Sequence, residues 1–218
     1  MSIFSRTKSA LYSKSWTVDH PTFGQIHFSS SKRISRLRIS VKPFLGIQVL
    51  IPVGLSQKKA NIFIEKKSNW IKKALSSAHQ TEEKSLAFFS SQELKPLAEI
   101  RMILTSRLSK LASANQFSYN KVSIRDQKSR WGSCSHENNI SLNQKLYYLP
   151  DDIRDYVLLH ELAHTIQKNH SNRFWDILHQ ILGINETAIA RKELRSFEFL
   201  FYPPPKSTKK APIKKIGA

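Results

Sequence analysis

Residues 160–164 read His-Glu-Leu-Ala-His, so two histidines stand four positions apart in a stretch whose apolar spacing predicts an amphipathic helix. We expect this helix to begin at Leu149–Asp152, where a proline and two acidic residues suit a first turn, and to run to about Lys168. Residues four apart lie on one helical face, so both imidazoles can reach one metal ion. The chain is therefore expected to contain a helix with one face directed at a metal site.

Two imidazoles do not make a stable tetrahedral site, so a third ligand has to come from elsewhere in the chain. His170 is the preferred candidate if the helix ends before it, because a continuous helix would turn residue 170 to another face. Asn169 favours such an end, since asparagine tolerates the left-handed conformation that often follows a helix. His179, in the next predicted helix, and His136, in a predicted hairpin turn, are the alternatives.

Glu161 directly follows the first histidine and is the candidate catalytic residue. From that position its carboxylate can approach a water on the metal as general base without binding the metal itself. The pattern predicts a hydrolase with Zn²⁺ held by His160, His164 and His170, although nickel, cobalt or manganese suit the same ligands. The alternative interpretation is a helix whose histidines are merely buried and hydrogen-bonded.

The apolar period of the chain changes several times, which predicts an α+β fold. An alternation of period two before residue 52 predicts three or four short antiparallel strands, with a turn at Lys42–Gly46. Two helices are then expected at 57–78 and 91–114. Strands are expected around 122–124, 130–134 and 140–142, with a hairpin turn at His136–Asn139. Two helices capped by Ser171 and Asn185 are expected at the end, and Gly183 should end the first of them.

Several motifs of the chain resemble one known family, the YgjP-like metallopeptidase domain, which is similar to SprT-like and Wss1-type proteases in the zincin group. The resemblance covers roughly residues 25–200 and implies a zincin-like fold, zinc ligation by His160, His164 and His170, a catalytic Glu161 and a protein or peptide substrate. Its motifs are Ser129–Ser135, Asn139–Asn143, Leu149–Pro150, Asp155–Val157, His160–His164, Asn169–Ser171 and Phe174–Trp175.

Four segments are predicted along the chain. Residues 1–22 form an N-terminal extension and residues 23–80 a β-rich unit with a helix. Residues 81–202 form the metallopeptidase core, and residues 203–218, which open with three prolines and are rich in lysine, form a disordered basic tail. In the core, a strand at Arg130–Cys134 precedes the metal-binding helix, where a zincin would pair with an extended peptide. Plain packing is the alternative for this strand and is favoured for Trp131 and Cys134.

The net charge of +19 is unevenly distributed. Residues 1–100 carry +10, whereas residues 151–200, which contain the histidine motif, carry −2. A basic surface attracts polyanions, so the N-terminal region is a candidate for binding nucleic acid. A lysine-rich surface that is simply solvated is the alternative.

Cys134 is the single cysteine, so no intramolecular disulfide can form, and a reducing, cytoplasmic compartment is the simplest expectation. We find no apolar stretch of the length that a membrane span requires. The sequence does not predict the oligomeric state.

Two other functions compete with the peptidase. A metal-dependent phosphohydrolase acting on nucleotides would suit the basic surface, but the sequence has no glycine-rich phosphate loop or carboxylate cluster for a second metal. A nucleic-acid-binding module with structural zinc is the third possibility.

Overall fold

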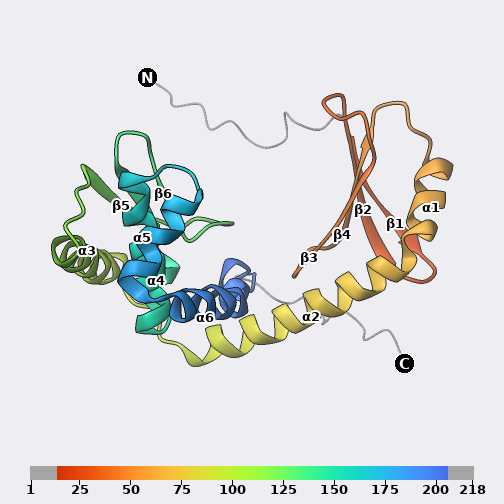
Figure 1. The fold of residues 1–218 in the computed structure, drawn as a ribbon. Coiled ribbons are helices and arrows are strands. Elements are labelled where there is room, and N and C mark those ends of the chain that lie inside the picture. Colours follow the sequence, from red (N-terminus) through yellow and green to blue (C-terminus); the bar gives the residue numbers. More distant parts are fainter. Residues whose placement is uncertain (1–13, 206–218) are drawn as a thin grey trace, which may run out of the picture. The chain divides into compact units, whose positions relative to one another are not determined.

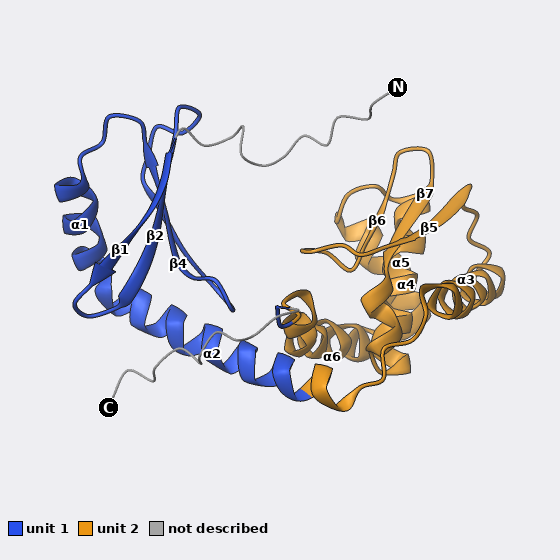
Figure 2. Cartoon of the chain, turned by 180° about the vertical axis from the view of Figure 1, so that it is seen from behind, with its two compact units in different colours: residues 1–87, 204–218 blue, residues 88–203 orange. Residues whose placement is uncertain are grey.

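The computed structural model describes residues 14–205 and divides the chain into two compact units (Figure 2). Unit 1 comprises residues 1–87 with 204–218, and unit 2 comprises residues 88–203. Each unit has its own sheet, helices and apolar core, which confirms the α+β fold (Figure 1). The first 13 residues of the predicted extension and all but three residues of the predicted tail lie outside the described residues. Among the residues that are described, none of the helices has the length and apolar character that a membrane span needs.

Unit 1 begins with a four-stranded sheet whose order is β1-β2-β4-β3. β1 pairs with β2 and β3 with β4 in antiparallel fashion, but the central pair, β2 and β4, is parallel. The prediction of antiparallel strands is therefore wrong for the central pair, because alternation shows which face a residue occupies and not which way its strand runs. The turn at Lys42–Gly46 is confirmed, with the N–H of Leu45 donating to the carbonyl of Lys42 at 3.1 Å. The strands are β1 (Lys14–His20), β2 (Gly24–Ser31), β3 (Arg38–Lys42) and β4 (Gly46–Pro52).

Two helices, α1 (Gln57–Lys66) and α2 (Ser68–Ser91), pack against one face of this sheet. The single helix predicted at 57–78 is wrong in two respects, since it breaks at Lys67 and the second helix continues to Ser91. Lys67 leaves helical geometry at φ −105° and ψ 10°, a local backbone change that apolar spacing does not encode. The buried core of this unit consists of Phe23, Ile26, Phe28, Ile47, Val49, Ile51, Ala60, Ile64, Ile71 and Leu75.

The first complete helix of unit 2 is α3 (Leu97–Ala114), which begins six residues later than predicted. Pro96 is not within the first turn but precedes the helix in an extended conformation (φ −57°, ψ 142°). A three-stranded sheet follows with the order β5-β7-β6, in which β5 and β7 are parallel and β6 and β7 form the predicted hairpin. The strands are β5 (Lys121–Arg125), β6 (Gly132–Cys134) and β7 (Asn139–Asn143), followed by the 3-10 helix η2 (Gln144–Tyr148).

The chain ends in four helical elements, α4 (Asp151–Ile166), α5 (Asn172–Leu182), α6 (Ile184–Leu194) and the 3-10 helix η3 (Arg195–Phe201). Gly183 ends α5 with φ 92°, as predicted. Asn185 does not cap the next helix, because Gly183 takes that position and α6 already begins at Ile184. The side chain of Thr187 donates to the carbonyl of Gly183 at 2.7 Å, so one glycine serves both helices.

Candidate metal centre

Helix α4 presents His160 and His164 on the same face, one turn apart, with their ring centroids 4.9 Å from each other. The opposite side of α4 is deeply buried, because Leu158, Leu159 and Leu162 are at most 2% exposed in the core of unit 2. This packing determines how the helix is rotated. It therefore directs the two imidazoles away from the core and toward the turn that follows the helix.

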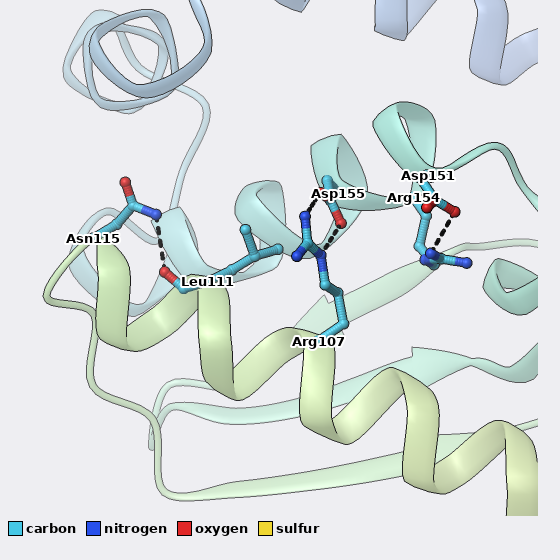
Figure 3. A network of polar contacts seen from close by, with 6 residues as sticks. All are labelled: Arg107, Leu111, Asn115, Asp151, Arg154 and Asp155. Carbon is cyan, nitrogen blue, oxygen red and sulfur yellow. Dashed lines mark hydrogen bonds and ion pairs between the residues drawn. The ribbon is translucent and has the colours of Figure 1, made fainter.

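An arginine of α3 also holds α4 in place (Figure 3). Arg107 donates through Nε to Asp155 Oδ1 at 2.8 Å and through Nη2 to the other carboxylate oxygen, which makes the contact bidentate. At the start of α4, Arg154 Nη2 donates to Asp151 Oδ1 at 2.6 Å. The first turn is thus tied to a neighbouring helix five residues before His160, so the histidine face has little freedom to rotate.

Helix α4 ends at Ile166, two residues before the predicted end, and the next four residues turn the chain back. Asn169 is not among the described residues that have a positive φ. It therefore does not adopt the expected left-handed conformation, and that prediction is wrong. Gln167 ends the helix instead with extended geometry (φ −125°, ψ 107°). Asn169 shapes the turn through its side chain, which accepts from Gln167 Nε2 at 2.7 Å and from the N–H of Ser171 at 3.3 Å.

The turn brings His170 back over the two helical histidines. Its ring centroid lies 5.0 Å from that of His160 and 4.7 Å from that of His164. Nitrogen atoms of the three rings all lie within 4.8 Å of one another. His136 and His179 do not belong to this group: the former is exposed in the β6–β7 turn, and the latter contacts Trp175 on α5.

The nitrogen atoms of the cluster fit a metal ion. His164 Nδ1 lies 3.0 Å from the carbonyl oxygen of Gln167, and donation of its proton there leaves Nε2 free as a ligand. Nε2 of His160 and Nε2 of His170 face each other at 3.0 Å, close to the roughly 3.3 Å that separates two nitrogens bound tetrahedrally to zinc at about 2.05 Å. Exposure increases from His164, which is buried, through His160 to His170, so the cluster opens to solvent on one side.

Burial also favours the neutral, metal-binding form of His160 and His164. The pKa of His160 is lowered to about 3, mainly by burial and further by the neighbouring His164 and His170. Burial lowers the pKa of His164 as well. Neutral imidazoles keep the lone pairs that a cation requires, whereas protonated rings would repel it.

Phe174 and Trp175 of α5, which the sequence showed only as one motif of the family resemblance, enclose the cluster. The ring of Phe174 is fully buried and lies 4.8, 4.5 and 4.7 Å from the rings of His160, His164 and His170. Trp175 stacks on His170 at 5.9 Å and 29°. Their position directly after the residue 169–171 turn is the sequence signal that could have identified them.

Glu161 lies beside the histidines and against strand β6. It is only 5% exposed, and its Oε2 is a buried atom without a hydrogen-bond partner in the described part of the chain. A Cβ added to Gly132 of β6 would lie 2.6 Å from Glu161 Oε1, a distance that real Cβ atoms do not reach. Only glycine therefore fits at 132 while Glu161 keeps its place, which gives this strand a function at the site besides general packing.

Burial raises the pKa of Glu161 to about 8, against the opposing effect of the positive charge of Arg130. A carboxyl group in such surroundings holds a proton more strongly than an exposed one. A cation at the three histidines would lower this pKa again, because it favours the charged form. The carboxyl group is thus suited to exchange a proton near neutral pH.

Lys168 joins the turn after α4 to the β6–β7 hairpin. Its Nζ donates to the carbonyl of Ser135 at 2.7 Å and to Asn138 Oδ1, and it lies 3.6 Å from Cys134 Sγ. Cys134 is partly buried, and burial raises the pKa of its thiol, which agrees with a packing role. The turn that carries His170 is consequently fastened to the sheet as well as to α4.

Residues 96–197 match the protein family described as YgjP-like, metallopeptidase domain. The chain contains a YgjP-like metallopeptidase domain. The matched segment includes α3 to α6 and all of the histidine cluster, whereas the sheet of unit 1 lies outside it. This domain makes the chain an enzyme of the metallopeptidase type with a metal-binding histidine triad.

The solved structures that are similar to this chain include two metallopeptidase zymogens. The metallopeptidase zymogen abylysin of Pyrococcus abyssi has a TM-score of 0.40 and 21% identity, over 43% of this chain and 92% of its own. The metallopeptidase zymogen jannalysin of Methanocaldococcus jannaschii has a TM-score of 0.40 and 19% identity, over 43% of this chain and 94% of its own. No curated protein matches the chain.

Proposed function

We propose that unit 2 is a zinc-dependent peptidase in which His160, His164 and His170 hold the ion and Glu161 is the general base. The convergence of three imidazoles from α4 and the following turn, with a buried carboxyl group beside them, carries this proposal. Three imidazoles are a donor set that zinc accepts in catalytic sites. The substrate is a protein or peptide, as the family implies.

Zinc, when bound, lowers the pKa of a coordinated water toward about 7 and polarises the carbonyl group that is attacked. Glu161 takes the proton of that water as the oxygen adds to the carbonyl carbon of the peptide bond. The same carboxyl group then gives the proton to the leaving nitrogen. A pKa raised by burial and lowered by the cation suits both transfers, and the free Oε2 provides an atom to accept the proton.

The openness of the cluster supports catalysis over a structural zinc site. Structural sites are closed by four protein ligands, whereas catalytic sites keep one position for water or substrate. Here the third histidine is exposed, and no fourth metal-binding side chain joins the cluster among the described residues. A phosphohydrolase with two metal ions is not supported either, since residues 14–205 contain no second cluster of this kind.

Strand β6 is suited to hold the substrate. It is an edge strand, because the sheet order β5-β7-β6 leaves it paired with β7 alone. Its Gly132 touches Glu161, so a peptide that pairs with the outer edge of β6 runs past the general base. Backbone pairing would give affinity for extended peptides with little dependence on their sequence.

Metal content tests the ligand set. Purified wild-type protein is expected to contain about one zinc per chain, and His170→Ala to lose most of it, measured by elemental analysis after gel filtration. His179→Ala is the matched control, because it removes a histidine of the adjacent helix that lies outside the cluster. Equal zinc content in wild type and His170→Ala would contradict the proposed ligand set.

Hydrolysis tests the role of Glu161. Glu161→Gln retains the size and the zinc but cannot accept a proton, so we expect casein hydrolysis to fall at least a thousandfold while the metal content stays unchanged. An activity within threefold of wild type would refute the general-base role. Loss of both zinc and activity would instead show that Glu161 is needed to maintain the site.

A further inference from the structure

The sheet of unit 1 has one apolar face and one polar face. The apolar face packs on α1 and α2, and its residues form the core of the unit. The strand register brings one residue of each strand, namely Thr17, His27, Gln48 and Ser40, into a single row on the opposite face. We call this opposite side the polar face; none of these four side chains is buried.

The edge strand β3 adds positive charge to the polar face. Arg38 and Lys42 lie two residues on either side of Ser40, so both point to the same side as the polar row. The loop before β3 carries three further cations. We call the whole set, which is Lys32, Arg33, Arg36, Arg38 and Lys42, the basic edge.

All five cations of the basic edge are exposed, and the segment 32–42 contains no acidic residue. Within residues 14–205, none of these five side chains forms an ion pair. Glu82, which contacts the β3–β4 turn, accepts from the N–H of Phe44 at 2.6 Å and does not pair with a cation. The fold thus concentrates charge at one edge and leaves it available to a partner.

The arrangement fits a phosphate backbone. Arg38 and Lys42 are four positions apart, which corresponds to about 13 Å along a strand, a length over which duplex DNA carries roughly eight charges. Hydroxyl and amide side chains beside the cations, such as Ser40 and Gln48, are common ligands of phosphate oxygens. The one acidic residue of the polar face, Asp19, is on β1 at the opposite edge of the sheet.

The aromatic residues of the sheet are not on the polar face. Trp16 of β1 and Phe28 of β2 stack on each other at 5.5 Å and 10°, on the side that packs against the helices. Proteins that bind single strands by stacking present such rings to the bases. Contacts to phosphates, with little dependence on sequence, are therefore favoured over contacts to bases.

Because exposed cations and polar side chains lie side by side here, we propose that the polar face and basic edge of unit 1 bind a nucleic acid through its phosphate backbone. The proposal does not depend on the metal centre, which belongs to the other unit. It gives the excess positive charge of unit 1 a binding role at the polar face and basic edge. It also predicts that the position of the cations, and not only their number, determines the affinity.

The test compares two variants of the full chain that lose the same charge. The first replaces Arg33, Arg36, Arg38 and Lys42 of the basic edge by glutamine. The control replaces four exposed lysines of the helices that cover the other face, Lys58, Lys59, Lys66 and Lys72, by glutamine. The charges of residues 1–13 and 206–218 remain the same in both variants.

Binding is measured by fluorescence anisotropy with a labelled 30-base-pair DNA duplex over a range of salt concentrations. At 0.1 M salt we expect the basic-edge variant to bind at least tenfold more weakly than wild type, and the lysine control to stay within threefold. The slope of log affinity against log salt should fall by about 0.9 for each phosphate that the variant no longer neutralises, so by up to about 3.6. Cooperative thermal unfolding of both variants at a temperature no lower than that of wild type shows that the fold is retained.

Three outcomes would overturn the proposal. The first is an equal decrease of affinity in the two variants, which would reduce the effect to net charge. The second is wild-type binding too weak to detect at 0.05 M salt. The third is stronger binding to vesicles that contain 30% phosphatidylserine than to DNA, which would assign the surface to membranes. Glu161→Gln should bind DNA as wild type does, so failure of the peptidase proposal leaves this test unaffected.

Discussion

The two units of this chain use charged side chains in different ways. The described part of unit 1, residues 14–87, contains 13 lysines and arginines against four acidic residues, whereas residues 88–203 contain 15 against 12. Most of the described ion pairs lie in unit 2, where Arg107, Arg154 and Lys145 contact aspartates around α4 and the sheet. In unit 1 the one described pair joins His20 to Glu65.

This difference relates to the task of each unit. Unit 2 has to hold three imidazoles and a carboxyl group in fixed positions, so its charges are paired and anchor the metal helix. Unit 1 presents unpaired cations on an edge strand, where they can meet a partner. Both units use a sheet edge, but β6 is proposed to offer backbone groups to a peptide and β3 is proposed to offer cations to phosphates.

Among the changes that test the contrast between the units, the largest effect is expected from filling the space between β6 and α4. Gly132→Val would push against Glu161 Oε1, since even a Cβ at this position would be 2.6 Å away. We expect casein hydrolysis to fall at least a hundredfold, because a displacement of about 1 Å in a catalytic group has effects of this size. DNA binding should stay unchanged if the units act separately.

Ser123→Ala, on β5 at the other edge of the same sheet, is the control for Gly132→Val and should retain activity. Hydrolysis at the wild-type rate in Gly132→Val would mean that Glu161 can shift without loss. That result would remove the contact with β6 from the proposed mechanism.

The second effect is stabilisation by metal, which should be confined to unit 2. At a zinc concentration a hundredfold above the dissociation constant, the stabilisation is about 2.7 kcal/mol. We expect chelation to increase hydrogen exchange of peptides in α4 and α5, measured by mass spectrometry, and to leave β2 and β4 unchanged. His170→Ala should abolish this response. An equal change in the unit 1 sheet would show that the units do not respond separately.

The third effect concerns the paired charges. Arg107→Ala removes a bidentate contact to Asp155, whose side chain is only 16% exposed. We expect unit 2 to lose about 1 kcal/mol of stability and some metal affinity, because the start of α4 is released. Arg101→Ala, which removes an exposed arginine of α3 that has no described ion pair, should change neither quantity. Zinc affinity is measured by competition with a chromogenic chelator.

The residue pattern predicted the convergence of the three histidines better than the fold around them. Spacing of four between His160 and His164 translates directly into a shared helical face, so the metal-binding face of α4 followed from the sequence. The return of His170 required only that the helix end before it. The expected left-handed turn was wrong, because the chain turns through the extended backbone of Gln167 and the side-chain contacts of Asn169.

Features that depend on long-range contacts could not be derived in this way. The parallel pairing of β2 with β4 depends on the path of the intervening chain, and the break at Lys67 changes no apolar position. The close contact between Gly132 and Glu161 joins residues 29 positions apart. Glycine in a strand indicates close approach of some group, but only the fold shows which one.

The smallest effect tests whether the cations of unit 1 are truly unpaired. Like charges on neighbouring residues repel each other, so replacing Arg33, Arg36, Arg38 and Lys42 by glutamine should stabilise unit 1 by a few tenths of a kcal/mol at low salt. The gain should disappear near 1 M salt, where the screening length falls to about 3 Å. Hydrogen exchange of the β2 and β4 amides measures it. If the variant were less stable at low salt, these side chains would be contributing to the fold, and the contrast between the two units would lose its basis.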